Sequence, residues 1–259
     1  MDIVKPTNLS EPEISDRFLW RYVDSEKLFD FVINKQMHLS RLDLFEDPLE
    51  GLDLQTKRSM MVQNISNDEN LIRMHPIKSR VELDKWQHGI YTSCWYMPEN
   101  ANESLAMWNL YSNDSGFAIK IKLSSIIESF LTGLNEYQND TELVNYYYGK
   151  VSYSSYMEIY NLAGNGENIL TCMLKDPGYE HEKEVRFVML RNTRDEAIPE
   201  RKSIRINLEA PPLNDLQIIA NPDMGKFTFD LFKEKLSDLG FELQKSRIIT
   251  RKVANKLIK

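Results

Sequence analysis

Cysteine is scarce in this chain, and long apolar runs are missing. Cys94 and Cys172 are the only thiols in 259 residues, and they lack the paired spacing of a zinc site. Both lie among apolar or aromatic neighbours, so we expect buried thiols. No run of about 18 apolar residues occurs, and the amino terminus has no apolar signal core. These absences predict a cytoplasmic protein with no membrane partner.

Histidine is also sparse, and several common enzyme motifs are absent. No two of the four histidines have the i, i+4 spacing of a helical metal site, so no metal is expected; they are His38, His75, His88 and His181. The chain has no phosphate-binding P-loop, no G-x-G-x-x-G after a strand and no G-x-S-x-G elbow. P-loop, Rossmann and α/β-hydrolase enzymes therefore have no support.

The overall composition is that of an ordinary globular protein. Hydrophobic residues make up 42%, charged residues 27% and aromatic residues 10% of the chain. Lys plus Arg is 32 against 39 for Asp plus Glu, so the net charge of -7 gives no general attraction to phosphate backbones. Nucleic acid is not an expected partner by default, and the length suits a single domain over residues 1–259.

Strand and helix patterns are interspersed along the chain. Aromatic, β-branched and alternating segments predict strands at 17–23, 37–40, 90–95, 116–122, 146–153, 182–191, 202–208, 216–220 and near 246–250. Capped or periodic segments predict helices from residue 24 or 25, at 104–111, at 123–130, in the segments leading to Leu174, and at 226–239. Several links between strands are too short for parallel crossovers. The fold class is therefore α+β, a mixed and mostly antiparallel sheet with helices packed on it.

The turn Phe45–Gly51 is rich in carboxylates and follows a strand, helix, strand unit. Polar loop residues fixed by Pro and Gly on a rigid scaffold often carry function, which makes Asp47 and Glu50 candidate site residues. The alternative is a solvated turn in which Asp47 caps the next segment.

A second polar run is Glu182–Arg186. If it lies on a strand, Glu182, Glu184 and Arg186 project from one face. Two neighbouring carboxylates raise one pKa unless an arginine or a polar substrate balances them, and such pairs suit hydroxyl binding or general-base work. The alternative is an exposed strand face with cross-strand ion pairs.

Two further sets of residues are candidates for ligand contacts. Arg21 could bind a phosphate with its guanidinium, and Tyr22 could stack on a flat heterocycle. Ser93, next to Thr92 in a predicted strand, could orient a ligand by hydrogen bonding. The alternatives are a surface arginine, a half-buried tyrosine and hydroxyl residues that merely fill a sheet.

The ordered set of motifs resembles a widespread bacterial family of unknown function. The motifs are Trp20–Tyr22, Phe45–Glu50, Ser104–Tyr111 with Gly116, and Glu182–Arg186. The typical family motif is F-N-D-P-F-E, and here Glu46 replaces the asparagine and Leu49 the second phenylalanine. The resemblance runs from the first strand to about Ser246 and implies no function, since that family is essentially uncharacterised.

The chain is similar, more distantly, to ADP-ribosyltransferases. Their R-S-E pattern is an arginine on the first strand, a serine in a middle strand and a later Glu-x-Glu, and Arg21, Ser93 and Glu182 to Glu184 occur in that order. The likeness implies an ADP-ribosyltransferase-like fold and a site for NAD. Arg21 would bind the diphosphate, Tyr22 would stack on nicotinamide, and Ser93 would orient the catalytic carboxylate or the ribose. Glu184 would hold the ribose hydroxyl, and Glu182 would position or deprotonate the acceptor.

Three functions follow as hypotheses. The first is NAD-dependent ADP-ribosyl transfer to a macromolecular acceptor, or NAD hydrolysis, by an intracellular bacterial enzyme acting in defence or as a toxin. The second is a non-catalytic module that binds a nucleotide, a dinucleotide or a protein. The third is a metal-dependent nuclease using Asp47, Glu50 and Glu182, which the acidic total disfavours.

Overall fold

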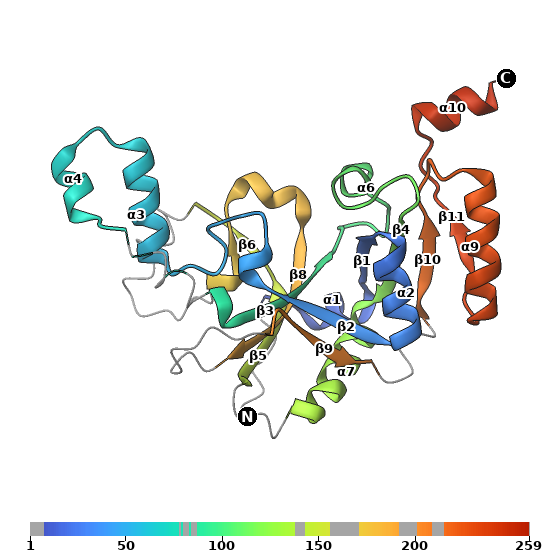
Figure 1. Ribbon diagram of the computed structural model, residues 1–259, viewed down its shortest axis with the longest axis horizontal. Helices are drawn as coiled ribbons and strands as arrows, with labels where there is room; N and C mark the ends of the chain where they lie inside the picture. Colours follow the sequence, from blue (N-terminus) through green and yellow to red (C-terminus); the bar gives the residue numbers. More distant parts are fainter. Residues whose placement is uncertain are drawn as a thin grey trace. The chain divides into compact units, whose positions relative to one another are not determined.

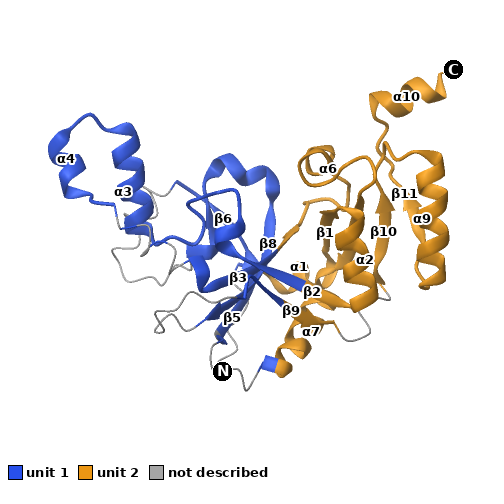
Figure 2. Cartoon of the chain, viewed as in Figure 1, with its two compact units in different colours: residues 1–8, 38–93, 137–204 blue, residues 9–37, 94–136, 205–259 orange. Residues whose placement is uncertain are grey.

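The computed structural model describes residues 8–77, 79, 83, 87–137, 143–155, 171–191, 201–208 and 215–258. The chain forms two compact units, each built from three separate segments (Figure 2). Unit 1 comprises residues 1–8, 38–93 and 137–204, and unit 2 comprises residues 9–37, 94–136 and 205–259. The boundaries fall inside β2 (Gln36–Arg41), β3 (Ile90–Tyr96) and β9 (Ser203–Asn207). The single domain over 1–259 stays a prediction.

Unit 2 contains four neighbouring strands in the order β11-β10-β4-β1 (Figure 1). Their bounds are Phe18–Val23 for β1, Phe117–Lys122 for β4, Gln217–Ala220 for β10 and Leu243–Lys245 for β11. β1 and β10 both run antiparallel to β4, whereas β11 runs parallel to β10. Tyr96, at the end of β3, pairs with Trp20 on β1.

Side-chain caps define the helices of unit 2. Asp24 accepts a hydrogen bond from the Lys27 N–H at the start of α2, and Ser104 accepts one from the Met107 N–H at the start of α6. The helical segments are α1 (Glu11–Asp16), α2 (Ser25–Asn34), α6 (Leu105–Tyr111), α7 (Leu123–Gly133), the short η2 (Leu134–Tyr137), α9 (Lys226–Asp238) and α10 (Arg251–Leu257).

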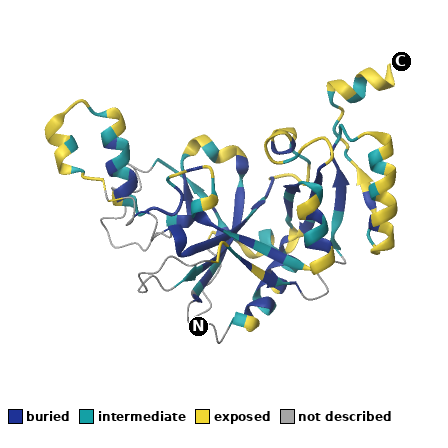
Figure 3. Cartoon of the chain, in the orientation of Figure 1, coloured by how far each residue is buried: buried dark blue, intermediate teal, exposed yellow. Residues whose placement is uncertain are grey.

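The sheet of unit 2 is covered on both faces. On one face, the rings of Tyr22 and Trp108 meet edge to face with centroids 4.8 Å apart, which places α6 against β1. On the other face, Phe117 of β4 packs against Phe232 of α9 with centroids 5.0 Å apart. The strands are mostly buried, whereas α9 exposes its outer side (Figure 3).

Unit 1 pairs β5 with β8 in an antiparallel ladder and β6 with β7 in a short parallel one. Ser40 of β2 pairs with Thr92 of β3. The remaining elements of unit 1 are η1 (Leu42–Leu44), α3 (Leu54–Ile65), α4 (Glu69–Met74), β5 (Leu143–Lys150), β6 (Ser152–Tyr153), η3 (Thr171–Met173), β7 (Leu174–Lys175), η4 (Pro177–Glu182) and β8 (Glu184–Arg191). A core of Leu42, Ile90, Cys172, Met173 and Val188 joins η1, β3, η3 and β8.

The predicted α+β class, with a mixed and mostly antiparallel sheet and packed helices, is confirmed. The strand predicted near 246–250 is wrong: Thr250 caps helix α10 by accepting from the Val253 N–H, so β11 is the last described strand and no strand occupies 246–250. The helical segments predicted before Leu174 lie partly in 156–170, outside the described residues, and there they stay a prediction; the short 3-10 helix η3 and strand β7 occupy 171–175.

The structure bears on the predictions about the two cysteines and about membrane-spanning segments. Cys172 is buried, as expected, whereas Cys94 is only half-buried, and the two cysteines are not joined in a disulfide. Among the described segments, no helix combines the length and the apolar character needed to cross a bilayer.

Candidate functional site

The turn that carries Asp47 and Glu50 is held rigidly by its own hydrogen bonds. Asp47 Oδ1 accepts from the Leu49 N–H at 2.9 Å, and the Asp47 carbonyl accepts from the Glu50 N–H. The Gln87 amide donates to the carbonyl of Glu50 at 2.9 Å. Gly51 has φ +71°, and a Cβ there would lie 2.2 Å from Leu42 Cδ2, so a larger residue would strain the turn. The Asp47 and Glu50 side chains are therefore fixed in place, and both are buried.

Glu50 belongs to a group of five buried ionisable side chains, which we call the paired-charge cluster. Its members are Glu50, Lys175, Glu182, Glu184 and Arg186. Lys175 Nζ lies 3.0 Å from Glu50 Oε1 and 3.0 Å from Glu184 Oε1, and it also donates to Glu182 Oε2. One ammonium thus binds three carboxylates, one from the Phe45–Glu50 motif and two from the Glu182–Arg186 motif.

Arg186 is the second cation of the cluster and is fully buried. Its guanidinium donates to Glu184 Oε2, to Glu50 Oε1 at 2.8 Å and to the Cys172 carbonyl at 2.6 Å. Glu50 and Arg186 are 136 residues apart in sequence. The Phe45–Glu50 motif and the Glu182–Arg186 motif therefore meet in one cluster.

The pKa values in the cluster follow from this pairing. Burial alone would raise the pKa of Glu184, but the charges of Arg186 and Lys175 and the hydrogen bonds to this carboxylate together hold that pKa well below its usual range. Burial alone would lower the pKa of Lys175, but the charges of Glu184 and Glu50 raise it. Both groups therefore stay ionised at neutral pH.

Two carboxylate oxygens beside these pairs have no hydrogen-bond partner within the described part of the chain. They are Glu50 Oε2 and Asp47 Oδ2, and both are buried. Burial, together with the nearby charge of Glu50, raises the pKa of Asp47. A buried acceptor without a donor costs free energy and is uncommon in folded proteins.

Sequence reasoning missed Lys175, Lys57 and Tyr153. Lys57 Nζ lies 3.4 Å from the Leu174 carbonyl, and burial lowers its pKa to about 8. The Tyr153 hydroxyl accepts from the Glu184 N–H at 2.8 Å and so fixes the start of β8. The Asp176-Pro177-Gly178 turn after Lys175 was the available signal, because it predicts a strand end at that lysine.

The predicted strand Glu182–Arg191 is too long by two residues. Asp176 caps η4, Pro177 opens it, and Lys183 adopts the left-handed conformation with φ 39°. Glu182 therefore ends a 3-10 helix, and β8 begins at Glu184. The two glutamates still meet, through Lys175 rather than through strand alternation.

The three predicted dinucleotide contacts lie in both units. Arg21 and Tyr22 are neighbours on β1 of unit 2 and project to opposite faces of its sheet. The Arg21 guanidinium lies 5.5 Å from the centroid of the Trp95 ring. Tyr22 is buried, and its hydroxyl accepts from the Ser104 N–H at 2.8 Å. Ser93 belongs to unit 1 and is fully buried on β3. Their assigned roles stay predictions.

The carboxylates do not form a recognisable metal site. Among the described residues, no group of three or more His, Cys, Asp or Glu side chains is arranged to hold a metal ion. The carboxylates of the cluster are instead bound to Lys175 and Arg186.

Comparison with known proteins gives a family of unknown function. Residues 107–187 match the profile of a family described as "Protein of unknown function (DUF2971)". The matched segment begins inside α6 and includes β4 and the Glu182–Arg186 motif but not the Phe45–Glu50 turn. None of the curated proteins and none of the solved structures gives a significant match. The match supports the resemblance to an uncharacterised family and supplies no activity.

Proposed function

We propose that the paired-charge cluster, with Asp47, is the chemical centre of an enzyme that cleaves the nicotinamide–ribose bond of NAD and passes ADP-ribose to water or to a macromolecular acceptor. The observation that supports this most is the meeting of the Phe45–Glu50 and Glu182–Arg186 motifs around Lys175. Perturbed ionisable groups gathered in one place are typical of functional sites. The likeness of the Arg21, Ser93, Glu182 and Glu184 order to ADP-ribosyltransferases is part of the same proposal.

Glu184 supplies a fixed negative charge in this scheme. Both of its oxygens are bound, to Lys175 and to Arg186, so the carboxylate cannot turn toward a substrate hydroxyl without breaking an ion pair. A fixed anion stabilises positive charge that develops on the ribose as nicotinamide leaves with the bonding electron pair. Glu184 therefore acts through its field, which revises the hydroxyl contact predicted from the sequence.

Glu50 and Asp47 take over the contacts with substrate and acceptor. Glu50 Oε2 is free to accept a hydrogen bond from a ribose hydroxyl. Asp47 has a raised pKa and a spare Oδ2, which suit a general base that removes the proton of the attacking water or acceptor. Without such a ligand, Glu50 Oε2 and Asp47 Oδ2 remain buried acceptors that receive no hydrogen bond within the described residues.

The test is release of nicotinamide from NAD by purified protein, measured by liquid chromatography. Asp47→Asn keeps the acceptor for the Leu49 N–H and removes the base, and we expect turnover to fall about 100-fold. Glu46→Gln is the matched control, because it changes an exposed carboxylate in the same turn. Circular dichroism and melting temperature check that both variants fold.

Equal turnover in Asp47→Asn and Glu46→Gln would contradict the role of Asp47. Absence of turnover in the wild type would contradict the enzyme proposal. The second candidate function, a binding module, would then be tested by titrating the wild type with NAD, since the spare acceptors of Asp47 and Glu50 favour a hydroxylated ligand in either case.

A further inference from the structure

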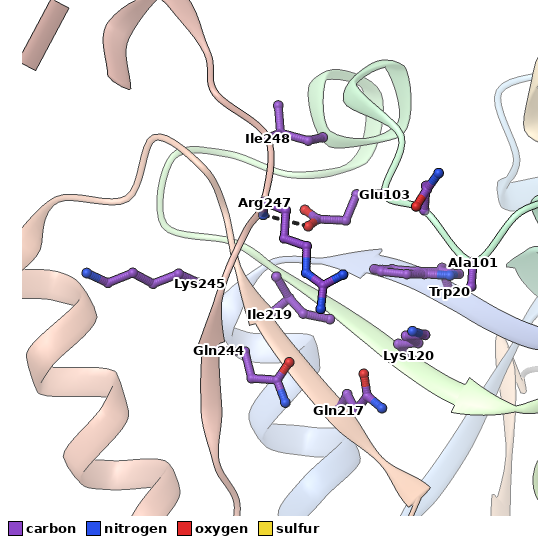
Figure 4. A pocket seen from close by; sticks show the side chains of 11 residues that line it. Trp20, Ala101, Glu103, Lys120, Gln217, Ile219, Gln244, Lys245, Arg247 and Ile248 are labelled. Atoms are coloured by element: carbon purple, nitrogen blue, oxygen red, sulfur yellow. Dashed lines mark hydrogen bonds between the residues drawn. The ribbon is translucent and has the colours of Figure 1, made fainter. Parts of the chain in front are cut away.

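A cavity of about 210 Å³ lies in unit 2, apart from any residue of the paired-charge cluster. Its lining includes Trp20, Glu103, Lys120, Gln217, Gln244 and Arg247 (Figure 4). We call it the Trp20 cavity. No residue predicted from the sequence as a site residue contributes to it.

Strand register explains how the floor of the Trp20 cavity forms. Trp20 on β1 pairs with Lys120 on β4, and Lys120 pairs with Gln217 on β10. Directly paired residues share one face of a sheet, so an aromatic ring, an ammonium and an amide stand in a row across three strands. Helix α6 packs on the same face through Met107 and Trp108, which contact Trp20, Tyr22 and Ala118, while Lys120 and Gln217 of the row remain half-buried.

The wall opposite the row is fixed by Glu103. Its Oε1 accepts from the Arg247 N–H at 2.8 Å, and its Oε2 accepts from the Trp108 indole N–H at 3.1 Å and from the Ser246 hydroxyl. Both oxygens are thus used by uncharged donors. Glu103 holds the chain around Arg247 in place without forming an ion pair with its guanidinium.

Two cations, Lys120 and Arg247, line the cavity, and within the described residues neither forms an ion pair with a carboxylate. Lys120 Nζ lies 4.6 Å from the centroid of the Phe18 ring and 5.2 Å from that of Trp20. Arg247 reaches into the cavity from the segment after β11 (Figure 4). Burial and the like charge of Arg247 lower the pKa of Lys120, although the charge of Glu103 opposes them. Lys245, in contrast, lies over the ring of Phe229 at 5.3 Å.

The third spare donor is the indole N–H of Trp20. Trp20 is 3% exposed, and its Nε1 has no hydrogen-bond partner within the described residues. A buried N–H without an acceptor is unusual in a folded protein. The cavity therefore combines unpaired positive charge with an unpaired donor, and both are met by one kind of group, an oxyanion.

We infer that the Trp20 cavity binds the phosphate group of a phosphorylated small molecule, with the phosphate oxygens between Lys120 and Arg247. Phosphate supplies several acceptors and the negative charge that both cations lack. The amides of Gln217 and Gln244 also line the cavity and are placed to contact the rest of the ligand, for which a nucleoside monophosphate and a sugar phosphate are the candidates tested below. This site does not depend on the activity proposed for the paired-charge cluster.

The test is isothermal titration with inorganic phosphate, AMP, ribose 5-phosphate and adenosine. We expect the three phosphate-containing probes to bind and adenosine to bind at least about tenfold more weakly than AMP. The relative affinities of AMP and ribose 5-phosphate tell which kind of molecule carries the phosphate. Failure of all three phosphate probes to bind, or equal binding of adenosine and AMP, would overturn the inference.

Charge-removing variants locate the binding. Lys120→Gln and Arg247→Gln should each weaken phosphate and AMP binding about tenfold, because each removes one charge-assisted hydrogen bond. Lys233→Gln, which removes an exposed cation on α9 outside the cavity, is the control and should leave binding unchanged. An equal loss in all three variants would mean diffuse attraction of anions and would contradict the assigned site.

Discussion

Two charged regions of this protein use opposite arrangements. In the paired-charge cluster of unit 1, three glutamates surround Lys175 and Arg186, and what remains spare are acceptor oxygens of Glu50 and Asp47. In the Trp20 cavity of unit 2, the carboxylate is used by neutral donors, and what remains spare are donors. The cluster is thus suited to ligands that donate hydrogen bonds, and the cavity to ligands that accept them.

Because the charges are paired in one region and unpaired in the other, the first region should matter mainly for stability and the second mainly for ligand binding. Removing one member of a buried ion pair strongly lowers the free energy of unfolding, because the partner charge is left unpaired in a medium of low dielectric constant. Exposed or half-exposed ions without partners contribute little to folding and remain available for a ligand. Mutations in the two regions should therefore have different effects.

The largest contrast is expected between Arg186→Leu and Arg247→Leu. Loss of Arg186 leaves Glu50 and Glu184 with one shared cation, and should lower the free energy of unfolding by about 3–5 kcal/mol. Loss of the exposed Arg247 side chain should change it by less than about 0.5 kcal/mol. Urea unfolding measures both, and similar losses would contradict the comparison.

Lys57 should give the protein an unusual dependence on alkaline pH. Burial lowers its pKa from 10.5 to about 8, so the folded state loses this proton before the unfolded state does. Stability should therefore rise between about pH 8 and pH 10.5, by about 2–3 kcal/mol from this group. Lys57→Met should remove the rise. If the free energies of unfolding of the wild type and of Lys57→Met differ by the same amount at every pH, the pKa of Lys57 is not lowered by folding.

Glu184 should make stability depend on pH in the acidic range. Its pKa is lowered in the folded state by Arg186, so its contribution is present above its ordinary pKa of 4.5 and is lost as the pH falls toward the folded value. On acidification, the free energy of unfolding of the wild type should fall by on the order of 2 kcal/mol more than that of Glu184→Gln. Parallel acid unfolding curves for the two proteins would be inconsistent with the ion pairs described.

The smallest effects are expected from a matched pair of tyrosines. Tyr22→Phe and Tyr153→Phe each remove a hydroxyl that accepts from one backbone N–H, of Ser104 and of Glu184, and each should cost about 1 kcal/mol. Only Tyr153→Phe should lower nicotinamide release, since Tyr153 fixes the start of β8. A loss of activity in Tyr22→Phe of the same size would contradict this separation.

Local sequence patterns predicted most elements but not their neighbours. The alternation in 116–122 predicts β4 and its two faces, and Asp24 and Ser104 predict the starts of α2 and α6. The row of Trp20, Lys120 and Gln217 could not be predicted, because the order β10-β4-β1 depends on contacts between distant segments.

The sequence predicted most residues of the candidate site but not how they contact one another. Glu50, Glu182, Glu184 and Arg186 were identified from two polar motifs, but their meeting depends on a contact across 136 residues. Lys175 was missed because a single lysine in an otherwise apolar segment resembles a solvated residue. Only the folded chain places it among three carboxylates.

The most direct test of the comparison is to map amide shifts by NMR while the protein is titrated separately with inorganic phosphate and with NAD. Phosphate should shift the amides of residues 101–103, 120 and 244–248, and NAD should shift those of residues 47–50 and 172–186. If phosphate leaves the Trp20 cavity unshifted, or NAD leaves the paired-charge cluster unshifted, the assignment of donor and acceptor ligands to the two regions is wrong.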